Sequence, residues 1–345
     1  MQRIKVIIAP VLFLFILSAV LGSCTTTVRA ENGDNPDFHL IKTIPLPHIS
    51  GRIDHLSIDL KNHRLFISAL GYNSVVVLDL KKEKIIHRIS GLDHPQGVLY
   101  IPGLNKLFVS TAGDGKLFVY NAADYQLQKT IDFGDDADNL RYDSASGIVY
   151  VAYGSGGLGL VNAKNNRLIK KIPLDGHPEA FSINNQDSLI FVNIPDVGEL
   201  ATISLKNYKV VNKTSFIGGL GNFPMALDPA HHRLFVGFRL LPRLKVLNSR
   251  TMKLIATLKT DRDADDIYYD AQKKRIYISC GGGYLDVIRQ ETPDTYKLQT
   301  RIKTVEGART SLYVPQQKYF YLAVPKSEHN SAEIRIYQRG NAVTH

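Results

Sequence analysis

The 345-residue chain lacks tryptophan, holds only two cysteines (Cys24 and Cys280) and contains no apolar run of full membrane-spanning length. Two cysteines cannot form a disulfide framework for a chain of this size. The Cys-x-x-Cys-His motif that attaches a c-type haem is also missing. These absences exclude a disulfide scaffold, a multispanning membrane protein and a c-type cytochrome.

Helical periodicity is absent as well. Apolar residues alternate with polar ones or form runs of three to five, which is typical of β-strands. Hydrophobic residues make up 44% and charged residues 21% of the chain, as in ordinary folded domains. The net charge of +10 is compatible with binding to nucleic acid, with contact to anionic lipid or with simple solubility.

The N-terminus reads as an export signal. Arg3 and Lys5 precede an apolar core at 7–21, and the sequence Leu-Gly-Ser-Cys at 21–24 resembles a bacterial lipobox. We therefore predict a signal peptide at 1–23, an acylated Cys24 and a flexible tether at 24–37. Ordinary cleavage before Glu31 remains the alternative. Either route predicts an exported protein. Acylation would make it an outer-membrane lipoprotein with the lipid on Cys24 as its membrane contact, and cleavage before Glu31 would release it into the periplasm.

A repeat organises the rest of the chain. An aromatic residue inside an apolar strand recurs at positions 66, 108, 150, 191, 235, 277 and 321, with spacings of 41 to 44 residues. Each unit contains segments for four short strands, which is the pattern of a propeller blade. The seventh unit has three strands, so we expect His39–Pro45 to pair with Glu333–Tyr337 as its fourth. The sequence predicts an all-β, seven-bladed β-propeller at 38–340 with a tail at 341–345.

The strand motif, the Gly-Arg-Ile-Asp-His-Leu segment at 51–56 and the Gly-Asp-Asp-Ala-Asp-Asn segment at 134–139 resemble the YncE-like, YVTN-repeat propellers of bacteria. The YVTN spelling itself is replaced here by Phe-Ile-Ser-Ala, Phe-Val-Ser-Thr and Tyr-Val-Ala-Tyr. The resemblance implies the propeller fold and leaves the function open, because propellers serve as enzymes, sensors and scaffolds.

Polar residues recur where the chain enters the innermost strand of each blade, and this register should ring the upper mouth of the central channel. The entry column consists of Asp54, Gln96, Asp138, Glu179, Phe223, Asp265 and Arg309. Two residues earlier stand Arg52, His94, Asp136, His177, Gly221, Asp263 and Gly307, and one residue later stand His55, Asn139, Asp266 and Thr310. We predict ligand-binding residues among the polar members of these columns.

Carboxylates from four blades should repel one another at this mouth unless a cation balances them. A divalent cation could be held by Asp54, Asp138, Glu179 and Asp265. Ion pairs with Arg52 and Arg309 would instead make a metal unnecessary, and Asp or Asn side chains at such positions also terminate loops. No other cofactor is expected.

The opposite ends of the blades carry basic turns, for example 81–84 and 273–275, together with Lys61, Arg64 and Arg233. This face should be solvated, or should contact anionic lipid if Cys24 is acylated. Export and the lack of interleaved aromatic residues argue against nucleic acid as a partner.

Catalytic motifs are missing. No nucleophile elbow appears in a usable context, and quinoprotein dehydrogenases of similar fold depend on the tryptophan that this chain lacks. Cys280 reads as a small buried hydrophobic residue. The sequence therefore favours a scaffold that binds a protein, peptide, glycan or small polar ligand on its upper face. The alternative is a metal-dependent hydrolase, such as a lactonase, with His55 or His177 as base.

Overall fold

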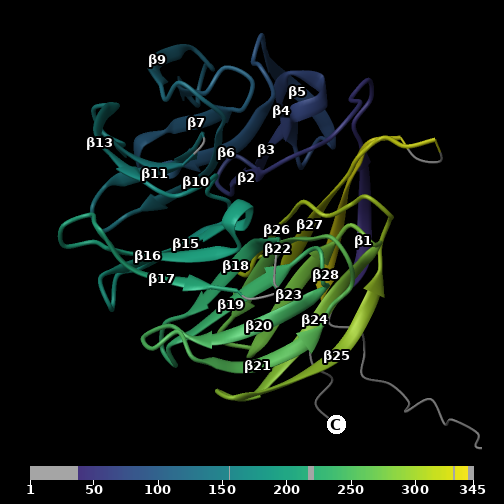
Figure 1. Ribbon diagram of the computed structural model, residues 1–345. Coiled ribbons are helices and arrows are strands. Elements are labelled where there is room, and N and C mark those ends of the chain that lie inside the picture. The colour runs from purple at the N-terminus through teal and green to yellow at the C-terminus, as the bar shows by residue number, and fades with distance from the viewer. Residues whose placement is uncertain (1–37, 155, 217–220, 329–330, 341–345) are drawn as a thin grey trace, which may run out of the picture. The chain divides into compact units, whose positions relative to one another are not determined.

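The computed structural model describes residues 38–154, 156–216, 221–328 and 331–340, and these form seven four-stranded antiparallel sheets arranged in a ring (Figure 1). The predicted seven-bladed β-propeller is confirmed. The signal peptide, Cys24, the tether and the tail at 341–345 lie outside the described residues. Within the described part of the chain, no helix is long and apolar enough to cross a membrane.

Each blade runs from an innermost to an outermost strand. The first blade holds β2 (Leu56–Asp59), β3 (Arg64–Ala69), β4 (Ser74–Asp79) and β5 (Lys84–Ser90). The second holds β6 (Pro95–Ile101), β7 (Lys106–Thr111), β8 (Lys116–Asn121) and β9 (Leu127–Asp132). The third holds β10 (Ala137–Asp143), β11 (Ile148–Tyr153), β12 (Gly157–Asn162) and β13 (Arg167–Pro173). Short 3-10 turns η1 (Leu70–Tyr72) and η2 (Pro102–Leu104) link strands in the first two blades.

The remaining blades follow the same plan. The fourth holds β14 (Phe181–Asn184), β15 (Leu189–Ile194), η3 (Pro195–Val197), β16 (Glu199–Ser204) and β17 (Val210–Ser215). The fifth holds β18 (Asn222–Asp228), β19 (Arg233–Phe238), β20 (Arg243–Asn248) and β21 (Leu254–Lys259). The sixth holds β22 (Ala264–Asp270), β23 (Arg275–Cys280), β24 (Tyr284–Thr292) and β25 (Thr295–Lys303). The seventh holds β26 (Ser311–Val314), β27 (Tyr319–Val324), β28 (Glu333–Arg339) and β1 (Phe38–Pro45).

The N-terminal strand closes the ring, as predicted. β1 pairs antiparallel with β28, with Ile44 opposite Ile334, so the seventh blade is built from both ends of the propeller sequence. Phe38 packs against Tyr277 of the sixth blade, with ring centroids 5.0 Å apart. Pairing β1 in this way covers the strand edge that β28 would otherwise expose.

The repeating aromatic residues form the core between the sheets. All seven are buried, none more than 1% exposed, and each lies on the second strand of its blade. Large side chains at one register fill the wedge between neighbouring blades, which explains why the sequence repeats them. Cys280, also on a second strand, is fully buried among apolar neighbours, as expected.

The innermost strands kink at one end, and this kink positions the polar columns. Register shifts occur in the innermost strands of four blades, at Pro95/Val98, Ala137/Leu140, Asn222/Met225 and Ala264/Asp266. A bulge of this kind re-aims side chains at the rim of a sheet. Gly97 shows how tight the packing is, because a Cβ there would lie 2.3 Å from the main-chain oxygen of Asp138. In these four blades the bulges thus re-aim the entry residues, whereas β2, β14 and β26 begin after their entry residues and have no such shift.

The basic turns at the other end differ from the prediction most clearly at Arg64. Lys81, Lys82 and Lys84 are exposed, but Arg64 is buried. The Arg64 guanidinium donates to Asp59 at 2.7 Å and to the main-chain oxygen of Ala122 in the next blade. Arg64 therefore stabilises contact between two blades and adds little charge to the exposed face.

Candidate ligand site in the central cavity

A cavity of about 490 Å³ lies at the kinked ends of the innermost strands and receives residues from all seven blades. Seven of the predicted site residues line it: Arg52, Asp54, His55, Asp138, Asn139, Glu179 and Asp265. The structure therefore brings together residues that are more than 200 positions apart in the sequence.

The other predicted residues do not line the cavity. His94 is exposed and contacts Asp93 at 2.7 Å. Gln96 donates to Asp136 at 2.9 Å. His177 and Arg309 contact the lining residues Asp138 and Asp265 without lining the cavity themselves. Asp263 contacts Arg309 and Arg239, which also lie outside the lining.

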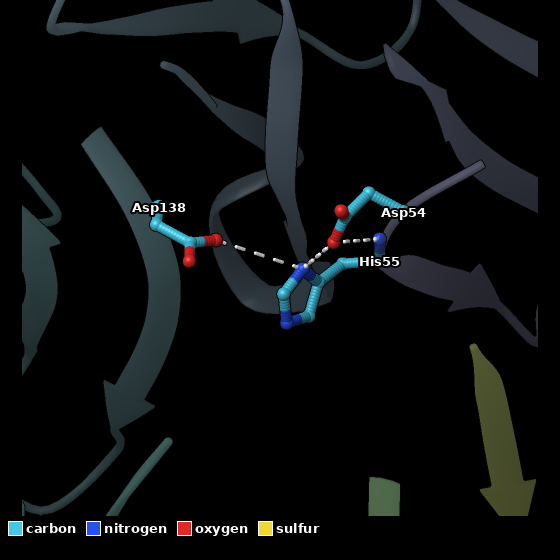
Figure 2. Close-up of side chains that lie close together, drawn as sticks. All are labelled: Asp54, His55 and Asp138. Carbon is cyan, nitrogen blue, oxygen red and sulfur yellow. Dashed lines mark hydrogen bonds and ion pairs between the residues drawn. The ribbon is translucent and has the colours of Figure 1, made fainter. Parts of the chain in front are cut away.

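One part of the mouth, here called the histidine side, consists of Asp54, His55, Asp138, His177 and Glu179 from the first, third and fourth blades. Figure 2 shows the ring of His55 between two carboxylates, with Nδ1 lying 2.7 Å from Asp54 Oδ1 and 4.0 Å from Asp138 Oδ1. Arg52 contacts the other oxygen of Asp54 at 2.6 Å. Asp54 thus has two basic neighbours, whereas Asp138 has none within hydrogen-bonding distance in the described residues.

The orientation of the His55 ring is fixed from its far nitrogen. His55 Nε2 lies 2.9 Å from Asn139 Oδ1, which also accepts a hydrogen bond from Arg141 at 3.1 Å. An arginine can only donate, so the atom facing it must be the amide oxygen of Asn139. That oxygen in turn requires a proton on Nε2 of His55.

His177 is held in the same way. Its Nδ1 lies 2.8 Å from the main-chain oxygen of Gly154, an acceptor, and therefore carries the proton. Its Nε2 faces Asp138 Oδ2 at 3.9 Å. Nδ1 of His55 and Nε2 of His177 therefore face different oxygens of the same carboxylate, that of Asp138.

The other part of the mouth, the arginine side, consists of Arg239, Asp263, Asp265 and Arg309. Arg309 binds both oxygens of Asp263, at 2.9 and 2.8 Å, and lies 3.4 Å from Asp265. Arg239 forms an ion pair with Asp265, and its guanidinium stacks on the Phe223 ring at 3.7 Å. Every carboxylate here has a guanidinium partner.

Burial and neighbouring charges shift the pKa values of groups on both sides of the mouth. Burial opposes the charged form of His55, but the hydrogen bond and charge of Asp54, with the charge of Asp138, raise its pKa to about 9. Burial and the charge of Asp138 raise the pKa of Glu179 to about 7. On the arginine side, burial and the charge of Arg309 lower the pKa of Arg239 to about 10.

Two overlapping groups of side chains have the atoms that could hold a metal ion. Asp54, His55 and Asp138 form one group, and Asp138, His177 and Glu179 form the other, with the atoms of each group within 4.8 Å of one another. Asp265 belongs to neither, because its oxygens face Arg239, Arg309 and Thr310. A site of this kind would combine histidine nitrogens with carboxylates, unlike the all-carboxylate set expected from the sequence.

Sequence reasoning missed Arg239 and Arg141. Arg239 follows the second strand of its blade, so it belongs to a loop that the entry columns do not include. Arg141 lies two residues after Asn139, where the strand continues into the cavity. A search for cations in every loop on the same face would have identified Arg239.

Comparisons with known proteins support the fold. No family model matches the chain, and no curated protein matches it. A solved structure similar to it is the hydrazine synthase of Kuenenia stuttgartiensis, with 17% sequence identity and a TM-score of 0.70, covering 84% of this chain and 97% of that chain. At this identity the likeness shows a shared β-propeller fold alone, and membership of the YncE-like family stays a prediction.

Proposed function

We propose that this chain is an exported scaffold that binds a small polar ligand in the mouth of its central cavity. The observation that carries the proposal is a cavity of about 490 Å³ lined by every blade. Pockets for small molecules usually enclose about 300–1,000 Å³. Such a space suits a small molecule better than a folded protein, and for this reason we favour the small polar ligand among the partner classes.

The charge of the lining indicates which ligand to seek. Among the described residues that line the cavity, five are acidic and two are arginines. Asp265 is balanced by arginines, whereas Glu179 and Asp138 lack such partners. A ligand with a positively charged group would supply the missing counterion.

Thermal unfolding in the presence of a panel of amines, amino acids and organic acids tests the proposal. A cationic compound should raise the melting temperature with a dependence set by its Kd, and Glu179→Gln should reduce the effect. His231→Gln is the control and should respond like the parent. His231 lies in the turn between β18 and β19, at the end of these strands that is opposite the cavity mouth. If no compound of the panel shifts the melting temperature, or if Glu179→Gln responds like the parent, binding at this mouth is refuted.

A metal-dependent hydrolase is the second candidate, favoured by the two groups of potential ligand atoms around Asp138. Lactone hydrolysis that disappears on chelation and returns with added metal would support it. An unchanged rate after chelation would exclude metal-dependent turnover of that lactone.

Export belongs to the same proposal and depends on the N-terminal sequence. Cys24→Ala should move the protein from the membrane fraction to the soluble fraction of the envelope. A mature N-terminus at Glu31, read by intact-mass analysis of the native protein, would instead show that the chain carries no lipid on Cys24.

A further inference from the structure

We propose that Asp54, His55 and Asp138 bind a divalent transition-metal ion of the Zn²⁺ type at the wall of the cavity. This inference rests on the proposed function for its location and names a ligand for the same site. Its central observation is a geometric one: three potential ligand atoms converge, and two of them belong to side chains that are more than nine-tenths buried.

Asp138 is the group that needs a partner. It is 4% exposed, and among the residues that the structure describes its buried Oδ1 has no hydrogen-bond partner. A buried carboxylate oxygen without a partner costs about 1–3 kcal/mol or more. The oxygen faces His55 across 4.0 Å, as Figure 2 shows, and that distance is too long for a hydrogen bond.

A proton does not satisfy the cluster as well as a metal ion would. A proton on His55 Nδ1 pairs by charge with Asp54 Oδ1 at 2.7 Å, but the geometry does not form a hydrogen bond there, and Asp138 Oδ1 keeps no partner among the described residues. One divalent ion could contact all three atoms after small side-chain movements, because the atoms lie within 4.8 Å of one another. Neighbouring ligands of a tetrahedral zinc lie about 3.3 Å apart, and the two separations around Nδ1, 2.7 and 4.0 Å, lie on either side of this value.

The surroundings of His55 match those of a metal ligand. Histidines that bind metal usually donate their other ring N–H to an oxygen, which fixes the tautomer and the ring plane. Here that oxygen belongs to Asn139, whose amide is itself oriented by Arg141. Asn139 and Arg141 are therefore positioning residues for Nδ1 of His55.

The nitrogen ligand decides the type of ion. Imidazole favours zinc and its neighbours in the periodic table, whereas Ca²⁺ and Mg²⁺ prefer sites made wholly of oxygen. All three side chains also line the cavity, so a bound ion would be accessible to water or to a small molecule.

Isothermal titration of Zn²⁺ into the chelated full chain, purified in mild detergent without a polyhistidine tag, tests the inference. We expect saturable binding of one ion, weaker binding of Ca²⁺ and Mg²⁺, and at least a ~100-fold loss of affinity in Asp138→Asn. Asn139→Ala should weaken binding about 10–100-fold, and Asn139→Asp should restore it, because it keeps an acceptor for His55 Nε2.

His231→Gln is the matched control. His231 also contacts an aspartate, Asp228, at 2.8 Å, but that carboxylate has a further hydrogen-bond partner in Gln290. The control should bind Zn²⁺ like the parent, and circular dichroism should show that all variants are folded. Absence of Zn²⁺ binding, or equal binding by folded Asp138→Asn, would overturn the metal inference. Shifts produced by organic cations would then still support the proposed function, so the two can fail separately.

Discussion

The two sides of the cavity mouth hold carboxylates at equivalent positions of the blades but balance them differently. On the arginine side, Asp263 and Asp265 each contact a guanidinium. On the histidine side, Asp138 has two imidazoles at 3.9 and 4.0 Å, and its Oδ1 has no hydrogen-bond partner in the described part of the chain. The carboxylates of the arginine side have their counterions within the protein, whereas Asp138 on the histidine side could accept an additional positive charge. We therefore expect amide substitutions of the equivalent carboxylates Asp265 and Glu179 to change stability in opposite directions.

The largest effect should come from Arg239→Gln. This change removes the ion pair with Asp265, a hydrogen bond to the main-chain oxygen of Ala264 and the stacking on Phe223. The pair is only partly buried and Arg309 stays 3.4 Å from Asp265, so the total loss in the free energy of unfolding should be about 3 kcal/mol, at the lower end of the range for buried ion pairs. Urea unfolding followed by circular dichroism measures it. Arg239→Lys should fall between parent and Gln variant, because lysine keeps the charge and loses the planar fork.

Amide substitution at equivalent positions tests the comparison directly. Asp265→Asn should destabilise the protein by about 1.5–3 kcal/mol, because it weakens charged hydrogen bonds. Glu179→Gln should instead stabilise it by about 1–2 kcal/mol at pH 8, since burial and Asp138 oppose the ionised form of Glu179. Equal losses from both variants would show that the two sides do not differ.

The Glu179 effect should depend on pH. The pKa of Glu179 is raised from 4.5 to about 7 in the folded protein. Its contribution to the free energy of unfolding is therefore most favourable below pH 4.5 and is lost as the pH rises through 7. The stability gained by Glu179→Gln should therefore be small at pH 5 and larger at pH 8. Urea unfolding of both proteins at the two pH values measures the difference, and a gain confined to pH 5 would contradict the assignment.

The smallest effect should come from Arg52→Gln. Arg52 contacts buried Asp54 at 2.6 Å, but its own side chain is 45% exposed. Partly exposed ion pairs contribute about 0.2–1 kcal/mol. His55 also stays beside Asp54 in this variant, at 2.7 Å. A loss above about 2 kcal/mol in the same urea assay would mean that Arg52 balances the histidine side as fully as Arg239 balances the other.

The fold could be predicted because one physical requirement recurs in every blade. A large side chain must fill each wedge between sheets, so the aromatic residues from Phe66 to Tyr321 recur at the blade period. The entry columns followed from the same register, and they gave all the acidic residues that line the cavity.

The pairing inside the site could not be predicted in the same way. Register brought Asp138 and Asp265 to one mouth, but it did not show that Arg239 pairs with Asp265 and Asp263. Nor did it show that Asn139 and Gly154 fix the two histidine tautomers. Such pairings depend on side-chain directions and loop paths, which a repeat period does not contain.

The closing strand has a consequence for the order of folding. β1 is made first and its partner β28 last, so the seventh blade cannot be completed until nearly the whole propeller has been synthesised. Contacts between residues so far apart form slowly, and an unpaired edge can join another chain in the meantime. Ring closure should therefore be the late step that decides between a finished monomer and an aggregate.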